Sequence, residues 1–163
     1  MNKDERQKGF TLLELMVTIS VAAIILSFGV PGFISFIQNN RAVTHTNDLV
    51  TALNLARSEA TRRGTRILVC SSTDGATCED SNDWGTGWIV RTQGGELLRS
   101  WSERSGGAGV VLGSVSEVVF LARGSVQAGA VLAVRLPDCS GNQERVVTVN
   151  GAGRVAVARE NCS

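Results

Sequence analysis

The sequence predicts an α+β fold, in which one long amino-terminal helix packs against a head of antiparallel β-sheet. Residues 10–37 are almost entirely apolar, and residues 38–63 then carry apolar side chains at three- and four-residue steps, which is a helical period. From residue 65 onward, six or seven short strand-like segments alternate with glycine-rich or polar turns. A long helix followed by a run of strands is typical of the α+β class.

The apolar segment, residues 10–37, is long enough to cross a membrane. As a helix it would extend roughly 42 Å, which exceeds the roughly 30 Å of bilayer hydrocarbon. It contains a single charge, Glu14. A cleaved secretory signal is a poor fit, because the apolar run is about twice the usual length and no small-x-small cleavage site follows it. We therefore expect a segment that stays in the protein.

The helix is expected to continue to about residue 63, roughly 80 Å from residue 10. Pro31-Gly32 should bend it without ending it, since lipid penalises an open backbone. Gly64 is a natural stop, and Arg62 and Arg63 suit the negative end of the helix dipole. One apolar stripe should face the head; its residues are Ala42, Val43, Thr46, Leu49, Val50, Leu53, Ala56 and Ala60.

The head should begin at residue 65 and consist of short antiparallel strands. Gly94-Gly95 marks a hairpin, and a glycine-rich break at residues 106–109 divides the region. The expected strands cover residues 66–70, 84–91, 96–101, 117–122, 130–136, 145–150 and 154–158.

Four cysteines in the head indicate two disulfides and an oxidising compartment. Local pairing, Cys70 with Cys78 and Cys139 with Cys162, is the simplest of the three connectivities. A zinc site is the alternative. The chain has no Cys-x-x-Cys motif and its single histidine, His45, lies far away in sequence, so we expect neither a metal nor a cofactor.

The sequence offers little support for catalysis. His45 is the only imidazole, so no Ser-His-Asp or Cys-His arrangement can form without it, and we expect it to be solvated beside the apolar stripe. The glycines at 106–109 and 151–153 lack the strand–helix context of a phosphate loop. We expect a protein that is not an enzyme, with core or hairpin packing for Trp84, Trp88 and Trp101.

The stretch Lys8-Gly9-Phe10-Thr11-Leu12-Leu13-Glu14-Leu15 resembles the type IV prepilin signature, and Pro31 falls where that family has a kinking proline. The resemblance implies that residues 1–9 are a leader. A prepilin peptidase of the inner membrane would cut between Gly9 and Phe10 and methylate the new amino terminus of Phe10. Glu14 would then meet the Phe10 amine of an adjacent subunit; the alternative is that Glu14 only reaches the interface from the helix start.

The head resembles the GspH/FimT family of minor pilins and pseudopilins. The matching motifs occur in the family's order and cover nearly the whole chain. Cys139 and Cys162 resemble the FimU-like minor pilins of type IV pili more than the secretion pseudopilins. The motifs are Ala56-Arg57-Ser58-Glu59-Ala60, Arg63-Gly64, Trp84-x-x-Gly87-Trp88-Ile89-Val90, Val119-Phe120 with Gly124, and Gly151-Ala152-Gly153-Arg154-Val155.

This resemblance implies a pilin fold and a structural function. Residues 10–37 would be the transmembrane and filament-core half of the helix, and residues 38–163 a periplasmic head. The protein would pack helix against helix with other minor pilins and the major pilin, and would help to prime pilus assembly at the tip. It would reside in the inner membrane as a single-pass protein and later in the filament. The alternatives are a minor pseudopilin of a type II secretion system and a DNA-binding minor pilin.

DNA binding is the less favoured alternative. Some FimT-like members bind DNA through a Gly-Arg-x-Arg motif, but here Ala156 replaces the second arginine of Gly153-Arg154-Val155-Ala156, and the next cation is Arg159. The chain without its leader has 13 basic and 13 acidic residues, whereas phosphate binding needs convergent cations. Arg154 and Arg159 are therefore only candidate DNA contacts. We expect the arginines beyond residue 118 to lie on exposed strand faces.

Overall fold

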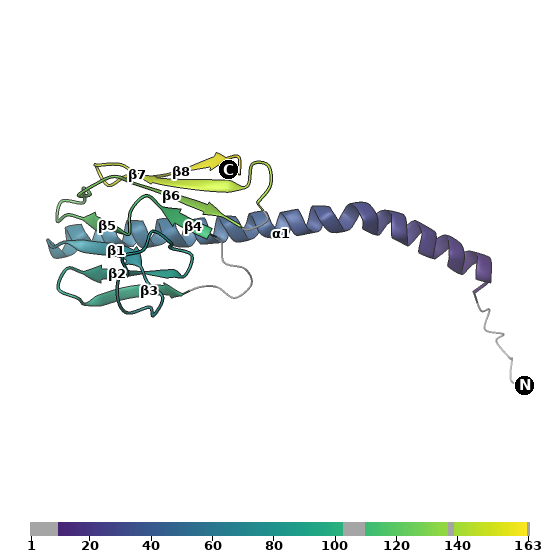
Figure 1. Ribbon diagram of the computed structural model, residues 1–163, viewed down its shortest axis with the longest axis horizontal. Coiled ribbons are helices and arrows are strands. Elements are labelled where there is room, and N and C mark those ends of the chain that lie inside the picture. Colours follow the sequence, from purple (N-terminus) through teal and green to yellow (C-terminus); the bar gives the residue numbers. More distant parts are fainter. Residues whose placement is uncertain (1–9, 103–109, 137–138, 163) are drawn as a thin grey trace, which may run out of the picture. The chain divides into compact units, whose positions relative to one another are not determined.

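The computed structural model describes residues 10–102, 110–136 and 139–162. It divides into two compact units, residues 1–37 and residues 38–163. The expected fold class is confirmed, because one long helix is followed by antiparallel β-structure (Figure 1). The elements are α1 (Leu12–Arg63), β1 (Ile67–Ser71), β2 (Gly87–Thr92), β3 (Leu97–Ser102), β4 (Val110–Gly113), β5 (Glu117–Phe120), β6 (Ala130–Arg135), β7 (Glu144–Val149) and β8 (Val155–Glu160).

Helix α1 has nearly the predicted bounds, and it continues through Pro31. It ends where Gly64 takes a left-handed conformation, with φ of 64°. This conformation costs glycine little and is a common way to finish a helix. Arg62 and Arg63 occupy the last turn, as the helix dipole favours.

The strands of the head form two antiparallel sheets of four strands. The first has the order β3-β2-β1-β5 and the second the order β4-β6-β7-β8. Strand β4 was not predicted; it has only four residues and directly follows the glycine-rich break. Two isolated bridges, Asp83 with Leu112 and Phe120 with Val126, add further pairing outside the named strands. The predicted segments therefore form strands, but their division between two sheets emerges only in the structure.

A single hydrophobic core holds the second unit together. The helix contributes a stripe of which Leu49, Leu53 and Ala56 are fully buried. Both sheets pack against this stripe, and Figure 1 shows the strands gathered along the carboxy-terminal part of α1. The sheet residues in the core include Ile67, Val69, Val90, Val118, Phe120, Leu132, Val134, Val147 and Val149.

Three residues from separate family motifs meet at one point of the head. A Cβ atom on Gly153 would collide with the backbone oxygen of Gly124, and both glycines have positive φ. The guanidinium of Arg57 lies beside both and donates a hydrogen bond from Nη2 to the carbonyl of Ala152, 3.3 Å away. These motif residues therefore join the helix to two turns of the sheets, which is a structural function.

Candidate assembly and binding sites

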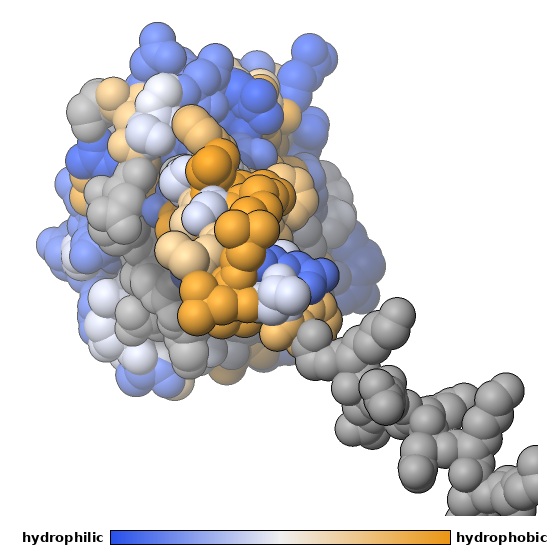
Figure 2. Space-filling model, turned by 90° about the vertical axis from the view of Figure 1, so that its right-hand side faces the viewer, coloured by the Kyte–Doolittle hydropathy of each residue, from blue (hydrophilic) through white to orange (hydrophobic). Residues whose placement is uncertain are grey.

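The amino-terminal segment exposes almost all of its apolar side chains. Phe10 is 81% exposed and Phe28 is 79% exposed. Figure 2 faces this part of the molecule, and strongly hydrophobic residues gather there. Among the described residues, α1 alone is long and apolar enough to cross a membrane, with a mean hydropathy of 2.2 in its most apolar window. Such a surface needs a lipid or protein environment, which the residues that the structure describes do not supply.

Glu14 lies at the start of α1, where a carboxylate has a local function. The Thr11 hydroxyl accepts a hydrogen bond from the backbone N–H of Glu14, at 3.2 Å, and so caps the helix. Threonine followed three residues later by glutamate is the capping-box pattern, and a negative charge in the first turn suits the helix dipole. The sequence prediction for Glu14 did not include this capping position.

The structure does not fully describe two of the positions that were predicted for processing and assembly, Gly9 and Pro31. Gly9 lies outside the described residues, so the structure gives no geometry for the Gly9–Phe10 bond. Pro31 is within α1, but its side chain also lies outside the description.

The four cysteines form the two disulfides that their spacing favours. Cys70 is bonded to Cys78, with Cα atoms 5.5 Å apart, and Cys139 to Cys162, with Cα atoms 5.8 Å apart. The first closes a polar loop after β1. The second fixes the chain beyond β8, where the backbone N–H of Cys162 also donates to the carbonyl of Gly141 at 2.9 Å.

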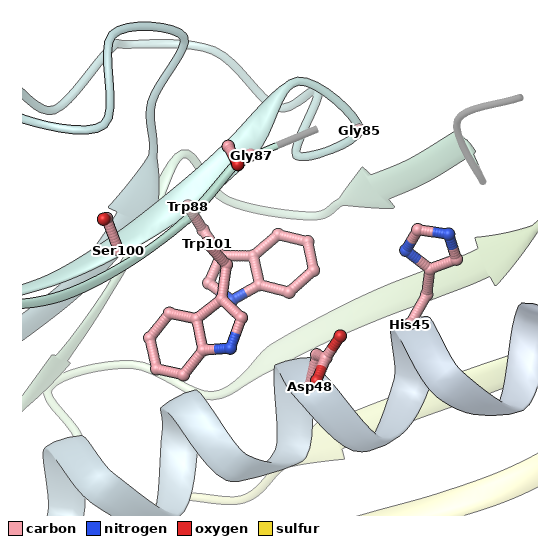
Figure 3. Close-up of a pocket in the computed structure, with 8 residues that line it drawn as sticks. His45, Asp48, Gly85, Gly87, Trp88, Ser100 and Trp101 are labelled. Atoms are coloured by element: carbon pink, nitrogen blue, oxygen red, sulfur yellow. The ribbon is translucent and has the colours of Figure 1, made fainter. Parts of the chain in front are cut away.

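A cavity of about 220 Å³ lies between the helix and the β2–β3 hairpin. His45 and Asp48 line it from α1, and Trp88, Ser100 and Trp101 line it from the strands (Figure 3). His45, which was expected to be solvated, is half-buried. The i, i+3 spacing of His45 and Asp48 on one helix face was a signal that could have suggested this arrangement.

The tryptophans pack as predicted. Trp84 is fully buried, and Trp88 stacks on Trp101 with ring centroids 6.4 Å apart. The guanidinium carbon of Arg99 lies over the Trp101 ring, 4.9 Å from the ring centroid. A Cβ on Gly87 would lie 2.6 Å from the Trp101 carbonyl oxygen, which explains the glycine in the Trp84-x-x-Gly87-Trp88 motif.

The arginines of the head have different environments. Glu59 accepts hydrogen bonds from Arg62 and Arg63, and these lower the pKa of Glu59 to about 2. Arg154 and Arg159 are exposed, as predicted. Arg145, in contrast, is only 5% exposed, so the prediction of an exposed strand face is wrong for this residue.

The burial of Arg145 follows from its place on the core-facing side of β7. Strand β7 runs antiparallel to β8, and Arg145 is the direct partner of Arg159. Burial first, and then the charge of Arg159, lower the pKa of Arg145. Strand alternation puts Arg145 on the same face as the core residues Val147 and Val149. Sequence reasoning had no access to this register.

The described residues contain no group of three or more His, Cys, Asp or Glu side chains that could hold a metal ion. The described residues show an exposed apolar segment at the start of α1 and a head with its own core and two disulfides. A small number of polar clusters lie on the surface of the head. Together they define the architecture of a pilin-type subunit, with a membrane-competent helix and a β-rich head.

The comparisons with known proteins give the family. Residues 45–153 match the family described as Type II transport protein GspH, and residues 5–30 match the prokaryotic N-terminal methylation motif. The chain belongs to the GspH family and is a GspH/FimT-like protein of the minor pilin and pseudopilin class. A comparison with curated proteins gives no significant match.

Solved structures of both kinds of machine share the fold. The type IV minor pilin FimU of Pseudomonas aeruginosa is 20% identical, with a TM-score of 0.62 over 78% of this chain and 99% of that one. The minor pseudopilin EpsH from the type 2 secretion system of Vibrio cholerae is 14% identical, with a TM-score of 0.51 over 72% of this chain and 96% of that one. At these identities the likeness shows the fold alone.

Proposed function

We propose that this protein is a minor pilin of a type IV pilus, which enters the filament through its amino-terminal helix and helps to prime assembly at the tip. The observation that carries the proposal is the exposed apolar segment behind a methylation motif, joined to a head that buries its own core. The protein is anchored in the inner membrane with its head in the periplasm until it joins the filament. Its partners are other minor pilins and the major pilin, and it needs no cofactor.

The pilus is preferred to the secretion machine because of the two head disulfides, which resemble the FimU-like minor pilins. The family description itself supports the second candidate, a minor pseudopilin of a type II secretion system. A clean deletion strain separates the two. Loss of surface pili with intact enzyme secretion is the expected result. Retained pili with failed secretion would assign the protein to the secretion machine.

The proposed processing is testable by mass. A prepilin peptidase cuts between Gly9 and Phe10, so the mature protein should lack residues 1–9 and carry one added methyl group at Phe10. Mass spectrometry of the membrane-extracted protein checks both changes. An intact leader in an assembly-competent strain would contradict the pilin proposal.

Glu14 is proposed to pair with the Phe10 amine of an adjacent subunit, since a carboxylate at hydrocarbon depth needs a partner. Glu14→Gln should lower incorporation into sheared filaments by at least about tenfold, if one charge pair of about 1.4 kcal/mol or more is lost. Glu59→Gln is the matched control on the same helix, and it should leave incorporation unchanged. Equal incorporation of the Glu14 variant and wild type would refute the pairing.

DNA binding at Arg154 and Arg159 remains the third candidate. Both side chains are exposed, but the second arginine of the family motif is replaced by Ala156. The full-length protein in detergent should therefore show little DNA binding in a gel shift at moderate salt. Tight binding that weakens steeply with salt would favour the DNA receptor instead.

A further inference from the structure

Strand β8 forms an open edge of the second sheet. The sheet has the order β4-β6-β7-β8, so β8 pairs with β7 on one side only, and it lies at the outer border of the head (Figure 1). Within the residues that the structure describes, no strand or bridge pairs with its other side. An open edge presents backbone N–H and C=O groups to which a further strand can bond.

The register of the β7–β8 hairpin shows which backbone groups face this edge. The N–H of Asn150 donates to the carbonyl of Arg154 at 3.1 Å, which continues the register of the two strands. Hydrogen-bonded pairs alternate with non-bonded pairs along an antiparallel ladder. Every second residue from Arg154 onward therefore bonds to β7, and Val155, Val157 and Arg159 turn their N–H and C=O groups outward. Among the described residues, these outward groups have no hydrogen-bond partner.

The other three edge strands are less open. The register of β3 on β2 is irregular, and such an irregularity is a common protection of an edge. The outer side of β4 is covered at Leu112, which forms a bridge with Asp83. Along β5, the carbonyl of Val119 accepts a hydrogen bond from the N–H of Gln127. Strand β8 keeps an unbroken register over six residues and contains neither proline nor lysine, so it is well suited to accept a further strand.

The side chains along this edge define the chemistry of a partner strand. Val155, Val157 and Arg159 share the face that points to the core in β7. Val155 packs against the core, whereas Val157 is 48% exposed and Arg159 is also exposed. An apolar side chain on the next strand would cover Val157.

The charge at the end of the edge adds a second requirement. Within the described part of the chain, Arg159 forms no ion pair, and its cross-strand partner in β7 is Arg145. Arg145 donates its hydrogen bonds to three neutral oxygen atoms, so no acid offsets either guanidinium there. Like charges opposite each other destabilise a strand pair, whereas an opposite charge on the next strand stabilises it. The position beside Arg159 therefore favours an acidic side chain.

We propose that the open edge of β8 receives an extended segment of a different, neighbouring subunit as a further antiparallel strand. Main-chain hydrogen bonds to Val155, Val157 and Arg159 hold the segment, and its side chains decide which neighbour fits. The side chain opposite Val157 is apolar, and the side chain opposite Arg159 is acidic. A second copy that paired through its own β8 edge would not fit, since its outward residues there include no acid. The proposal rests on the proposed function, because the assembly supplies the neighbour.

The first test is hydrogen exchange of the full-length protein in detergent, measured by NMR. The amide of Val157 should exchange at least about tenfold faster than the amides of Ala156 and Ala158, because those two amides are bonded to β7 or to no edge partner that can be lost independently of it. An equally slow Val157 amide would show that the chain itself covers this edge, and would overturn the proposal.

The second test is incorporation into sheared filaments. Val157→Pro removes an N–H that points away from β7, so the hairpin should keep its fold while the edge no longer accepts a strand. Incorporation should fall by at least about tenfold, because hydrogen bonds of about 1 kcal/mol each are lost and the ring blocks close approach. Val157→Thr keeps the N–H and is the matched control, with incorporation like that of wild type. Tryptophan fluorescence checks the fold of both variants.

The acidic partner has its own test in Arg159→Glu. The new carboxylate faces Arg145, so the variant does not lose stability of the head through charge. It should lower incorporation by about fivefold, because a favourable charge pair with the neighbour becomes a repulsive one. Arg154→Glu makes the same change of charge on the opposite face of the sheet and should have no effect. An equal loss in both variants would show a general effect of charge and would overturn the acidic partner.

The outcomes separate this proposal from the proposed function. If wild type itself is absent from filaments, the proposed function and this proposal fall together. If wild type and Val157→Pro enter filaments equally, strand addition alone is refuted. A wild-type dimer in detergent that Val157→Pro dissociates would assign the edge to a second copy instead.

Discussion

The two parts of α1 use apolar residues in opposite ways. Before residue 38, large side chains such as Ile24 and Phe28 are more than half exposed, whereas Leu49 and Leu53 in the later part are fully buried. The later part finds its partners within the chain, on the two sheets of the head. The earlier part has no such partners among the described residues. The later part of one continuous helix therefore belongs to the core of a folded domain. The earlier part exposes an apolar surface that other molecules must cover.

The largest test of this comparison is a matched pair of truncations to alanine, one in the core and one in the exposed segment. Leu53→Ala should lower the free energy of unfolding of the head by about 2–5 kcal/mol, because it leaves a cavity in the core. Ile24→Ala removes a similar volume from the exposed segment. It should change the free energy of unfolding of the head by no more than about 0.5 kcal/mol. Denaturant titration followed by tryptophan fluorescence measures both. A comparable loss in the two variants would mean that the head depends on the amino-terminal segment.

A smaller effect should follow from removal of the carboxy-terminal disulfide. Cys139→Ser together with Cys162→Ser opens a loop of 23 residues. In the chain-entropy description this costs about 3.4 kcal/mol, against about 2.5 kcal/mol for the Cys70–Cys78 loop of eight residues. Reduction of wild type with a thiol is the control for side reactions of the substitutions. If neither loss of stability appears, the hydrophobic core alone stabilises the head. The contrast between the buried and the exposed part of α1 would then be larger.

The smallest expected effect concerns two glutamates of the same helix. Glu59 is paired with arginines of its own chain, and its pKa is lowered from 4.5 to about 2. A carboxylate with a lowered pKa stabilises the folded state above its unfolded value and loses that contribution as pH falls from about 4.5 toward 2. Wild type should therefore be more stable than Glu59→Gln at pH 7, and the difference should vanish near pH 2.

Denaturant titrations at both pH values check this prediction. Glu14→Gln, at the other end of the helix, serves as the control and should leave the stability of the head unchanged at either pH. A difference between wild type and Glu59→Gln that persists at pH 2 would show that the variant perturbs packing rather than charge.

Much of this protein was determined by local sequence. The length and apolarity of residues 10–37, the helical stripe around Leu49 and Leu53, and the stop at Gly64 all depend on near neighbours in the chain, so they are readable without a structure. The disulfide pairing was readable for a similar reason, because each cysteine pairs with the nearest other cysteine in the sequence. The family motifs were readable too, although the sequence did not reveal why they matter.

Tertiary structure decided what depends on strand register and on which sheet a strand joins. Strand β4 is too short for its pattern to stand out, and its pairing with β6 makes it a strand. Register places Arg145 of β7 directly opposite Arg159 of β8, and a shift of one residue would move every side chain of the strand to the other face. The meeting of Arg57, Gly124 and Gly153 is likewise long-range. Contacts between distant segments reflect the packing of the whole core, and no local pattern encodes them.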